Sequence, residues 1–293
     1  MKTDTKKYLA KAGAKFSLKN YETSYNGSLD KETGEVALAK IKKQMAGCQE
    51  ALYASNTHSL LIIFQAMDAA GKDSAIEHVM SGLNPQGCQV YSFKTPNSEE
   101  YEHDYLWRHY KALPERGRIG IHNRSHYENV LVCKVHPEYI LSENIPGYQD
   151  VNQIDQKFWK QRYESIRNFE QHLTANGMVI LKFFLHVSKD EQKQRFLDRI
   201  EDPAKNWKFS AGDLKERALW KSYMQAYEEA IQETSTEAAP WYIIPADKKW
   251  YSRVAISQVI EETLEKLNLK FPQLPKKEVD QLATLKQQLI NEK

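Results

Sequence analysis

The feature that most constrains the fold is a strand-like apolar run that leads through a small-residue loop into a helix. Ser59–Gln65 (SLLIIFQ) is almost entirely apolar, which is typical of a central parallel strand covered by helices on both faces. It leads into Phe64–Ser74 (FQAMDAAGKDS), where Gly71 and Lys72 follow small residues. Small residues let backbone N–H groups approach an anion, and the helix N-terminus adds positive potential. The segment therefore predicts a phosphate-binding loop.

The loop departs at two positions from the common phosphate-binding pattern G-x-x-x-x-G-K-[ST]. Ala66 stands where the pattern has its first glycine, and Asp73 stands where it has the hydroxyl that binds Mg²⁺. The simpler alternative is an ordinary strand–turn–helix junction with Gly71 as a turn residue. Asp68 and Asp73 favour the phosphate site, because carboxylates suit a loop that shares Mg²⁺ with substrate phosphates. We expect Lys72 to reach the outer phosphates, and the rest of the expected phosphate-binding set is Ala69, Ala70, Gly71 and Ser74.

The alternation of strand and helix continues along the chain. Further strands are expected at Cys88–Lys94, Arg118–His122, Met178–Val187 and Trp241–Pro245. Helices are expected at Ala75–Leu83, Ser98–Leu113, from about Ser125, and at Val151–Ala175, Lys189–Arg199, Leu214–Glu233 and Lys249–Leu267. This order predicts a doubly wound α/β domain with a mainly parallel sheet.

The sequence divides into three expected parts. Residues 1–55 form a polar, Lys-rich arm of about 28 residues and a helix from Asp30, because apolar residues then recur at helical spacing (Val36, Leu38, Ile41, Met45 and Leu52). Residues 56–270 form the α/β domain. Residues 271–293 form a tail, in which the Lys-rich sequence after Pro275 predicts a solvated helix.

A second polar cluster follows a short apolar strand in Gly120–Val132 (GIHNRSHYENVLV). Open α/β sheets bind ligands at this end of their strands. Arg124 can donate two hydrogen bonds to phosphate oxygens, and Glu128 can hold a metal or orient a substrate. The alternative is an Arg124–Glu128 pair on a solvated helix face, which contributes about a few tenths of a kcal/mol.

A third segment, Lys189–Arg217, has the pattern of a lid that closes over phosphates. Arg195 and Arg199 share a helix face, and basic residues recur in the irregular stretch and the helix that follow, with Lys208 and Arg217 as candidate substrate ligands. We place the lid at about 200–217. The alternative is a salt-bridged surface hairpin, because residues 189–221 hold nine basic and seven acidic residues.

Composition excludes several classes of protein. Lys plus Arg number 41 against 39 Asp plus Glu, so neither nucleic acid nor a membrane is expected as a partner. The three cysteines lack a CxxC pair, and the sequence has neither a signal peptide nor a membrane-length apolar run, which fits a soluble cytoplasmic protein. The nine histidines show no sensible metal-ligand spacing. One aromatic run is more typical of core packing than of base stacking: Tyr101, Tyr105, Trp107 and Tyr110.

From the helix before Ser59 to about Leu269, the chain closely resembles the type 2 polyphosphate kinases. The resemblance rests on seven blocks in order: QAMDAAGKD (Gln65–Asp73), GLNPQG (Gly82–Gly87), HDYLWRHY (His103–Tyr110), NRSHYENVLV (Asn123–Val132), VNQIDQKFW (Val151–Trp159), LKFFLHVSK (Leu181–Lys189) and NWKFSAGDLKERALW (Asn206–Trp220). The family commonly has a residue other than Ser or Thr after its loop lysine, as Asp73 is here. Ala66 remains a small local departure.

The resemblance implies a thymidylate-kinase-like P-loop fold, a three-layer α/β/α arrangement with a helical lid, in a homo-oligomer (dimer or tetramer). It implies transfer of the terminal phosphoryl group of inorganic polyphosphate to adenine or guanine nucleotides, with Mg²⁺ (or Mn²⁺) as cofactor. NRSHYE, with Asn123 as a substrate ligand and Glu128, looks most like the subgroup that phosphorylates both AMP and ADP.

These inferences assign roles in an in-line transfer without a covalent enzyme intermediate. Lys72 and the loop backbone hold phosphates, and the expected Mg²⁺ ligands are Asp68, Asp73 and Glu128. Arg124 and lid residues such as Arg199 clamp the nucleotide phosphates or the polyphosphate end. Two rival interpretations remain: an ATP-dependent nucleoside monophosphate kinase, and a P-loop module that binds nucleotide without turnover.

Overall fold

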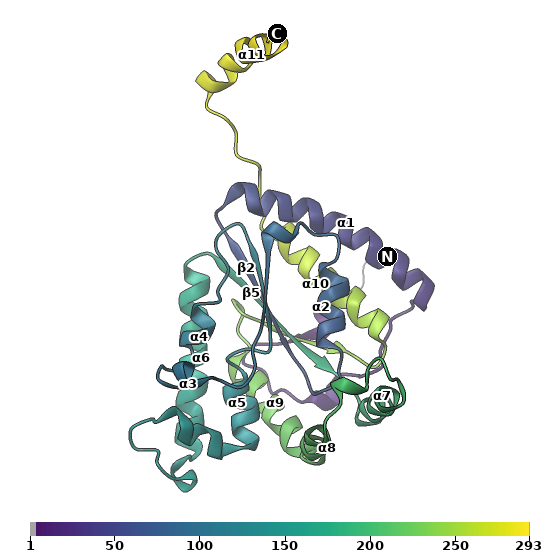
Figure 1. The fold of residues 1–293 in the computed structure, drawn as a ribbon, viewed down its shortest axis with the longest axis vertical. Coiled ribbons are helices and arrows are strands. Elements are labelled where there is room, and N and C mark those ends of the chain that lie inside the picture. Colours follow the sequence, from purple (N-terminus) through teal and green to yellow (C-terminus); the bar gives the residue numbers. More distant parts are fainter. Residues whose placement is uncertain (1–3, 293) are drawn as a thin grey trace.

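The computed structural model describes residues 4–292, and within them the chain forms one six-stranded sheet (Figure 1). The strand order is β1-β6-β5-β2-β4-β3, and the strands are β1 (Leu9–Ala10), β2 (Ser59–Gln65), β3 (Cys88–Ser92), β4 (Ile119–Asn123), β5 (Met178–His186) and β6 (Trp241–Pro245). All neighbours pair in parallel except β1 and β6, which are antiparallel. The predicted, mainly parallel sheet is confirmed.

β2 lies at the centre because its whole length is apolar enough to be covered on both faces. All seven of its residues are buried between β4 and β5. The rings of Phe64 on β2 and Phe183 on β5 stack with centroids 5.4 Å apart. Phe64 also pairs with Asn123, the last residue of β4. The loops that follow β2 and β4 therefore begin side by side.

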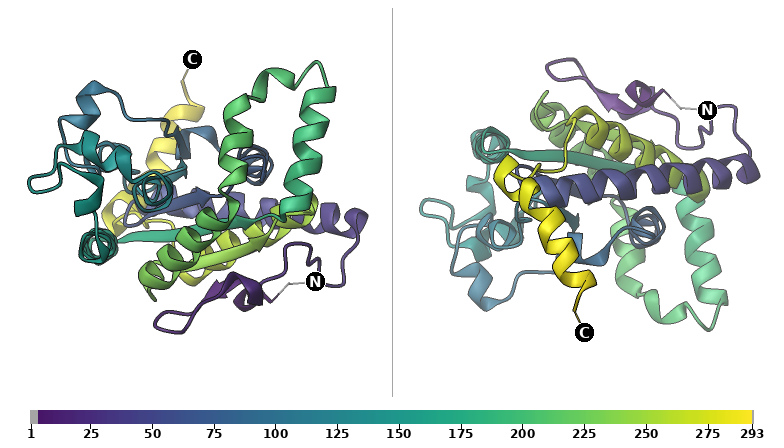
Figure 2. Two further views of the ribbon diagram at one scale, coloured as in Figure 1. Left: turned by 90° about the horizontal axis from the view of Figure 1, so that it is seen from below. Right: turned by 90° about the horizontal axis from the view of Figure 1, so that it is seen from above.

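Helices cover both faces of the sheet, so the predicted three-layer α/β/α arrangement is confirmed (Figures 1 and 2). One layer contains α1 (Lys31–Ser55), α2 (Lys72–Met80) and α10 (Lys249–Lys266). The other contains α5 (Glu128–Val135), α6 (Gln156–Ala175) and α9 (Trp220–Thr234). Helix α1 begins after Asp30 as expected, with Met45 and Leu52 buried, although Val36 is exposed.

Three expected helices have other bounds in the structure, two of them because a carboxylate side chain accepts backbone N–H groups. Ser98–Leu113 contains two short helices, α3 (Ser98–Tyr101) and α4 (Trp107–Tyr110), because Asp104 Oδ1 accepts the Leu106 N–H at 2.9 Å and starts a new turn. The helix expected from Val151 begins at Gln156, since Asp155 caps it. Leu214–Glu233 divides at Leu219 into α8 (Ala211–Ala218) and α9.

The expected irregular arm contains a strand that the sequence analysis missed. β1 extends the sheet beside β6, with Leu9 opposite Tyr242 and Ala10 opposite Trp241. Ser235 Oγ donates to the Ala10 carbonyl at 2.7 Å. A two-residue strand shows no hydrophobic periodicity, because its position is set by the strand it pairs with. Residues 1–3 of the expected arm and residue 293 of the expected tail lie outside the described residues.

Helices α7 (Lys189–Glu201) and α8 project from the body as a hairpin, joined by a loop that contains the 3₁₀ turn Asn206–Lys208 (Figure 2). The segment at about 200–217, where we expect the lid, corresponds to the end of α7, this loop and α8. The other 3₁₀ turns are Thr5–Tyr8, Leu18–Asn20, Pro85–Gly87, Pro137–Glu143 and Val151–Gln153.

The C-terminal helix α11 (Lys276–Ile290) stands away from the body at the end of an extended segment (Figure 1). None of its residues is buried. Within residues 4–292, no helix combines the length and the apolar character needed to cross a membrane.

Candidate active site

The predicted phosphate-binding loop connects the carboxyl end of β2 to the first residue of α2, which is Lys72. Ala69 and Gly71 both have positive φ, of 59° and 103°. Residues in this left-handed region turn successive N–H groups toward one side, which makes a concave anion site. The sequence therefore produces the strand, loop and helix start that a bound phosphate requires.

Lys72 is buried and folds back over its own loop. Its Nζ donates to the Ala66 carbonyl at 2.9 Å. Burial lowers the pKa of Lys72, and Arg124 lowers it further, while the carboxylates of Asp68, Glu128 and Asp73 act in the opposite direction. A phosphate placed here would add negative charge beside the ammonium and favour its charged form.

Arg124 and Asp68 meet because their loops leave adjacent strands. Arg124 follows β4, and its N–H donates to the Phe64 carbonyl at 3.0 Å. Its φ of 64° turns the side chain toward the phosphate loop, where Nη2 lies 3.2 Å from Asp68 Oδ1. Burial opposes the charge of Arg124, but Glu128 and Asp68 raise its pKa above the ordinary value. The structure thus brings together three predicted site residues.

Asn123 and Asp73 form a second link between the two loops. Asn123 Nδ2 donates to Asp73 Oδ1 at 2.6 Å, and Asp73 occupies the first turn of α2. Ser74, the next residue, accepts a hydrogen bond from Arg253 Nη2 at 2.8 Å. Asn123 therefore orients the carboxylate that replaces the usual hydroxyl.

The three expected metal ligands do not form a closed metal centre. Within residues 4–292, no group of three or more His, Cys, Asp or Glu side chains is arranged to hold an ion. Asp68 and Asp73 nevertheless present accessible carboxylates at the two ends of the loop. Burial raises the pKa of Glu128, and Arg124 and Lys72 oppose that rise. These hard oxygen donors fit a Mg²⁺ ion that takes its remaining ligands from phosphates and water.

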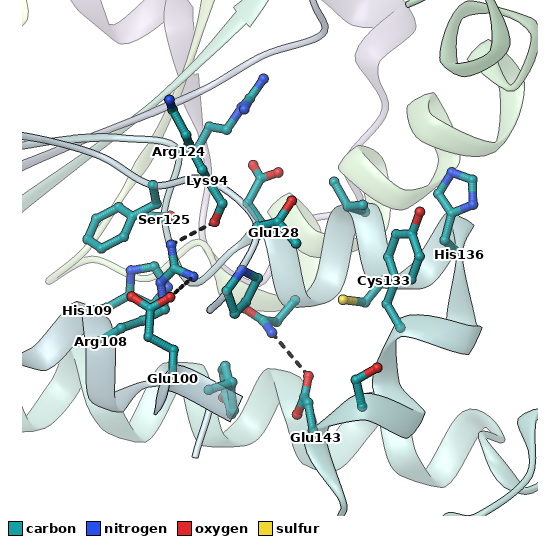
Figure 3. Close-up of a pocket in the computed structure, with 18 of the residues that line it drawn as sticks. Lys94, Glu100, Arg108, His109, Arg124, Ser125, Glu128, Cys133, His136 and Glu143 are labelled. Atoms are coloured by element: carbon teal, nitrogen blue, oxygen red, sulfur yellow. Dashed lines mark hydrogen bonds and ion pairs between the residues drawn. The ribbon is translucent and has the colours of Figure 1, made fainter. Parts of the chain in front are cut away.

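A cavity of about 590 Å³ opens beside the loop, on the side of α5 (Figure 3). Asp68, Arg124 and Glu128 line one end of it, and Asn129, Cys133 and His136 line its wall along α5. Its volume lies within the range of small-molecule sites. The cavity is therefore large enough for a nucleotide whose phosphates reach the loop.

Sequence reasoning missed the opposite wall of this cavity. Tyr101 and Tyr105, for which the sequence favours core packing, line the cavity. Arg108 fixes the wall: its Nη1 donates to Glu100 Oε2 at 2.9 Å and its Nη2 to the Lys94 carbonyl at 2.7 Å (Figure 3). The aromatic residues can be recognised in the sequence. Whether they line a cavity depends on the break between α3 and α4, which the sequence analysis did not predict.

The lid places its three candidate residues in different surroundings. Arg217 Nη1 donates to the Lys189 carbonyl at 2.7 Å and to Gln192 Oε1 at 2.8 Å. Lys208 Nζ lies 5.0 Å from the centre of the Trp207 ring, near the tip of the lid. The Arg199 guanidinium lies 5.8 Å from the Phe196 ring. In this conformation Arg217 therefore binds the start of α7, at the base of the hairpin.

Basic side chains from α10, which the sequence analysis did not single out, stand beside the start of α2. A Cβ on Gly71 would lie 4.0 Å from Lys249 Cε, and Arg253 contacts Ser74. Burial lowers the pKa of Lys249, and the charges of Arg195, Arg199 and Arg253 lower it further, against the opposing effect of Glu191. Mutual repulsion among cations is relieved when an anion binds among them.

Taken together, the parallel sheet, the lysine-bearing phosphate loop, the arginine after the neighbouring strand and the helical lid define a P-loop kinase. Carboxylates beside the loop suit a metal-dependent phosphotransferase, because a passive anion site would be weakened by them.

Comparisons with known proteins identify the branch of this class. The family model of polyphosphate kinase 2 (PPK2) matches residues 28–272. The chain is 50% identical over 291 residues, 99% of this chain and 100% of the relative, to an ADP-polyphosphate phosphotransferase of Rhodopseudomonas palustris. It is 44% identical to an AMP/ADP-polyphosphate phosphotransferase of Meiothermus ruber, over 92% of this chain and 96% of the relative.

A solved structure agrees in fold. The crystal structure of polyphosphate kinase 2 from Arthrobacter aurescens TC1 superposes with a TM-score of 0.87 at 38% sequence identity, covering 97% of this chain and 95% of that one. The chain belongs to the polyphosphate kinase 2 family.

Proposed function

We propose that this enzyme transfers the terminal phosphoryl group of inorganic polyphosphate to nucleoside mono- and diphosphates, converting AMP to ADP and ADP to ATP. One observation carries the proposal: a nucleotide-sized cavity and a cluster of cations reach the same phosphate loop from the two helical layers of the fold. Membership of the family supports polyphosphate as donor. The names of the two relatives support ADP, and for one of them AMP, as acceptor.

The acceptor occupies the cavity on the α5 side in this proposal. Tyr101 and Tyr105 offer aromatic surfaces to the base, and Arg124 lies where the cavity meets the loop. Arg124 carries a dispersed charge and several donors, which suits contact with phosphate oxygens. Asn123 acts through Asp73, whose carboxylate it orients.

The donor approaches from the α10 side in this proposal. Lys249, Arg253 and Arg199 carry the positive charge there, although the chain as a whole has a net charge of only +2. A polyanion is attracted by such a local concentration of cations rather than by net charge. Lys208, at the tip of the lid, can meet a longer chain farther from the reacting end.

The reaction is an in-line displacement in which the acceptor's terminal oxygen attacks the terminal phosphorus of the donor. The bond from that phosphorus to its bridging oxygen breaks, and the shortened polyphosphate leaves with the electron pair. Lys72 moves from the Ala66 carbonyl onto the reacting phosphates and offsets their growing negative charge. Asp68, Asp73 and Glu128 would hold Mg²⁺, which supplies further charge neutralisation. The lid excludes water from the reacting phosphates, so that the phosphoryl group is transferred to the nucleotide rather than to water.

The proposal is tested by incubating purified protein with Mg²⁺ and long-chain polyphosphate, with ADP alone and then with AMP alone. Product from both acceptors supports the proposal in full, and product from ADP alone restricts it to diphosphates. A reaction of AMP that needs ATP and ignores polyphosphate would establish the rival monophosphate kinase. Protection of the protein by nucleotide with no transfer at all would establish the rival binding module.

We also propose that the protein acts as a homo-oligomer, which light scattering of the purified chain measures directly. A monomer mass at working concentration would overturn this part of the proposal alone.

A further inference from the structure

Helix α7 presents two buried polar side chains to the phosphate loop. Gln192 is 1% exposed and Arg195 is 5% exposed. Gln192 Nε2 donates to the Asp68 carbonyl at 2.9 Å, and Arg195 Nη1 donates to the carbonyls of Ala69 at 3.0 Å and Ala70 at 2.7 Å. Three successive loop carbonyls are therefore held by one helix.

These hydrogen bonds from α7 determine the direction in which the N–H groups of the loop point. In a trans peptide the carbonyl and the following N–H lie on opposite sides of the chain. Holding the carbonyls of Asp68, Ala69 and Ala70 toward α7 turns the next N–H groups away from it, and of these the Ala70 N–H donates to the Met67 carbonyl at 3.2 Å. Ala69 also has a φ of 59°, a conformation that a residue with a Cβ keeps only when its surroundings enforce it. Gln192 and Arg195 supply that enforcement.

Arg195 is fully engaged by the protein itself. Its Nη2 donates to the carbonyls of Ala246 at 2.6 Å and Asp247 at 3.1 Å, beyond the end of β6, and its Nε donates to Glu191 Oε1 at 2.7 Å. These contacts fix the loop relative to α7 and β6. They also distinguish Arg195 from Arg199, with which it shares a helix face, because none of these donors is directed at a substrate.

Gln192 extends the same connection to the lid. Its Oε1 accepts from Arg217 Nη1 on α8 at 2.8 Å, while its Nε2 binds the Asp68 carbonyl. The Asp68 carboxylate in turn holds Arg124. One amide side chain thus joins the lid helix to the residue that positions the arginine of the site.

We propose that Gln192 and Arg195 are positioning residues for phosphoryl transfer, which hold the phosphate-binding loop in its anion-binding conformation, and that Gln192 couples the lid to that loop. This inference rests on the proposed function. It adds two residues that touch neither substrate and act through the backbone of residues 68–70.

The main test compares Gln192→Leu with Gln194→Leu, a matched control on the same helix whose exposed side chain bonds to Asp198 on α7. With polyphosphate and ADP, we expect kcat of Gln192→Leu to fall about tenfold to a hundredfold, because a misplaced loop loses its alignment with the transferring group. KM for ADP should change less than about twofold, since the cavity is intact. Gln194→Leu should behave as wild type.

Gln192→Glu separates positioning from packing. The substitution keeps an acceptor for Arg217 but removes the donor to the Asp68 carbonyl, so a similar loss of kcat with an unchanged melting temperature supports the proposal. Wild-type kcat in both Gln192 variants would overturn it. Arg195→Lys retains one charge but cannot contact four carbonyls, and full activity in that variant would overturn the role of Arg195.

A double-mutant cycle tests the coupling to the lid. If Gln192 transmits the position of Arg217, then Gln192→Leu and Arg217→Leu are non-additive, and the double variant is little worse than the more damaging single one. Losses of kcat that multiply independently would overturn the coupling.

Hydrogen exchange provides a readout that does not depend on activity. We expect the peptide that covers residues 66–73 to exchange faster in Gln192→Leu than in wild type, and to be unchanged in Gln194→Leu. Equal exchange in all three proteins would overturn the proposal. If wild-type protein gives no transfer from polyphosphate, the proposed function fails, while this comparison still decides whether α7 holds the loop.

Discussion

Lys72 Nζ lies 2.9 Å from the Ala66 carbonyl oxygen, so the lysine at the start of α2 is hydrogen bonded to the first residue of its own loop. The contact orders the side chain when no phosphate is in reach. Ala66 is also the position where the common pattern has glycine, and the contact uses only its backbone. The departure at Ala66 is therefore compatible with the lysine's role, because the side chain of residue 66 takes no part in this bond.

Replacing Asp68 by asparagine tests what the charge of its carboxylate contributes to the reaction. Asp68→Asn keeps the shape of the side chain but removes its negative charge, which weakens the bond to Arg124 and takes a carboxylate away from the proposed Mg²⁺ site. We expect kcat with polyphosphate and ADP to fall by about a hundredfold, or roughly 3 kcal/mol of barrier, and the Mg²⁺ concentration for half-maximal rate to rise. Steady-state assays across a Mg²⁺ titration measure both. Wild-type kinetics in the variant would contradict a role for the Asp68 carboxylate in binding Mg²⁺ and in positioning Arg124.

The buried pair of Lys182 and Glu170 makes a separate prediction about stability. Lys182 Nζ lies 2.5 Å from Glu170 Oε2, and Tyr127 donates to the other carboxylate oxygen at 2.8 Å. Burial opposes ionisation of Glu170, but Lys182 and His126 outweigh it and lower the pKa of this carboxyl. Lys182→Met leaves that buried carboxylate without its cationic partner, so we expect the free energy of unfolding to fall by about 3–5 kcal/mol.

Urea unfolding measures the effect of Lys182→Met, and a second variant supplies the control. Lys182→Met combined with Glu170→Gln removes both charges and keeps an acceptor for Tyr127. We expect the pair to recover at least half of the lost stability. Equal stability of the single variant and wild type would show that the charges contribute nothing to the fold.

Because His122 is buried, we expect the free energy of unfolding to decrease in acid. His122 is 1% exposed, and burial lowers its pKa to about 4, against an opposing hydrogen bond to the Ala112 carbonyl. Unfolded chain takes up a proton at this position near pH 6.5, whereas folded protein does so only near pH 4. Stability is therefore lost as the pH falls through that window.

Between pH 7 and pH 5, His122 should account for about 2 kcal/mol of the lost stability. We expect His122→Gln to lose correspondingly less than wild type between these pH values, as measured by urea unfolding. His172→Gln, on the exposed face of α6, is the matched control for replacing a histidine by glutamine. An identical pH dependence in His122→Gln would contradict a buried neutral imidazole.

The parts that the sequence predicted well are those set by neighbouring residues. Ser59–Gln65 is apolar throughout, and Gly71 precedes Lys72 directly, so strand, loop and helix follow from local chemistry. The meeting of Asp68 and Arg124 required one further step, that parallel neighbours end at the same edge of a sheet. The pairing of Phe64 with Asn123 shows that β2 and β4 do end at the same edge.

The parts that the sequence could not predict depend on contacts between distant segments. Arg195 lies 126 positions from Ala69 along the chain, and nothing in its own helix indicates that it binds loop carbonyls. β1 exists because β6 offers it an edge. The cavity wall at Tyr105 depends on a helix break at Asp104, where the carboxylate accepts the Leu106 N–H. In each case tertiary structure, rather than local propensity, decides the outcome.

The most direct test of the account is ATP formation from ADP, Mg²⁺ and long-chain polyphosphate, measured for wild type and Lys72→Ala. We predict steady ATP formation by wild type and a loss of at least about a hundredfold in Lys72→Ala, with similar melting temperatures for both proteins. Lys43→Ala, on the exposed face of α1, should match wild type. No ATP from wild type, or equal rates with and without Lys72, would contradict the proposal that polyphosphate reacts at this loop.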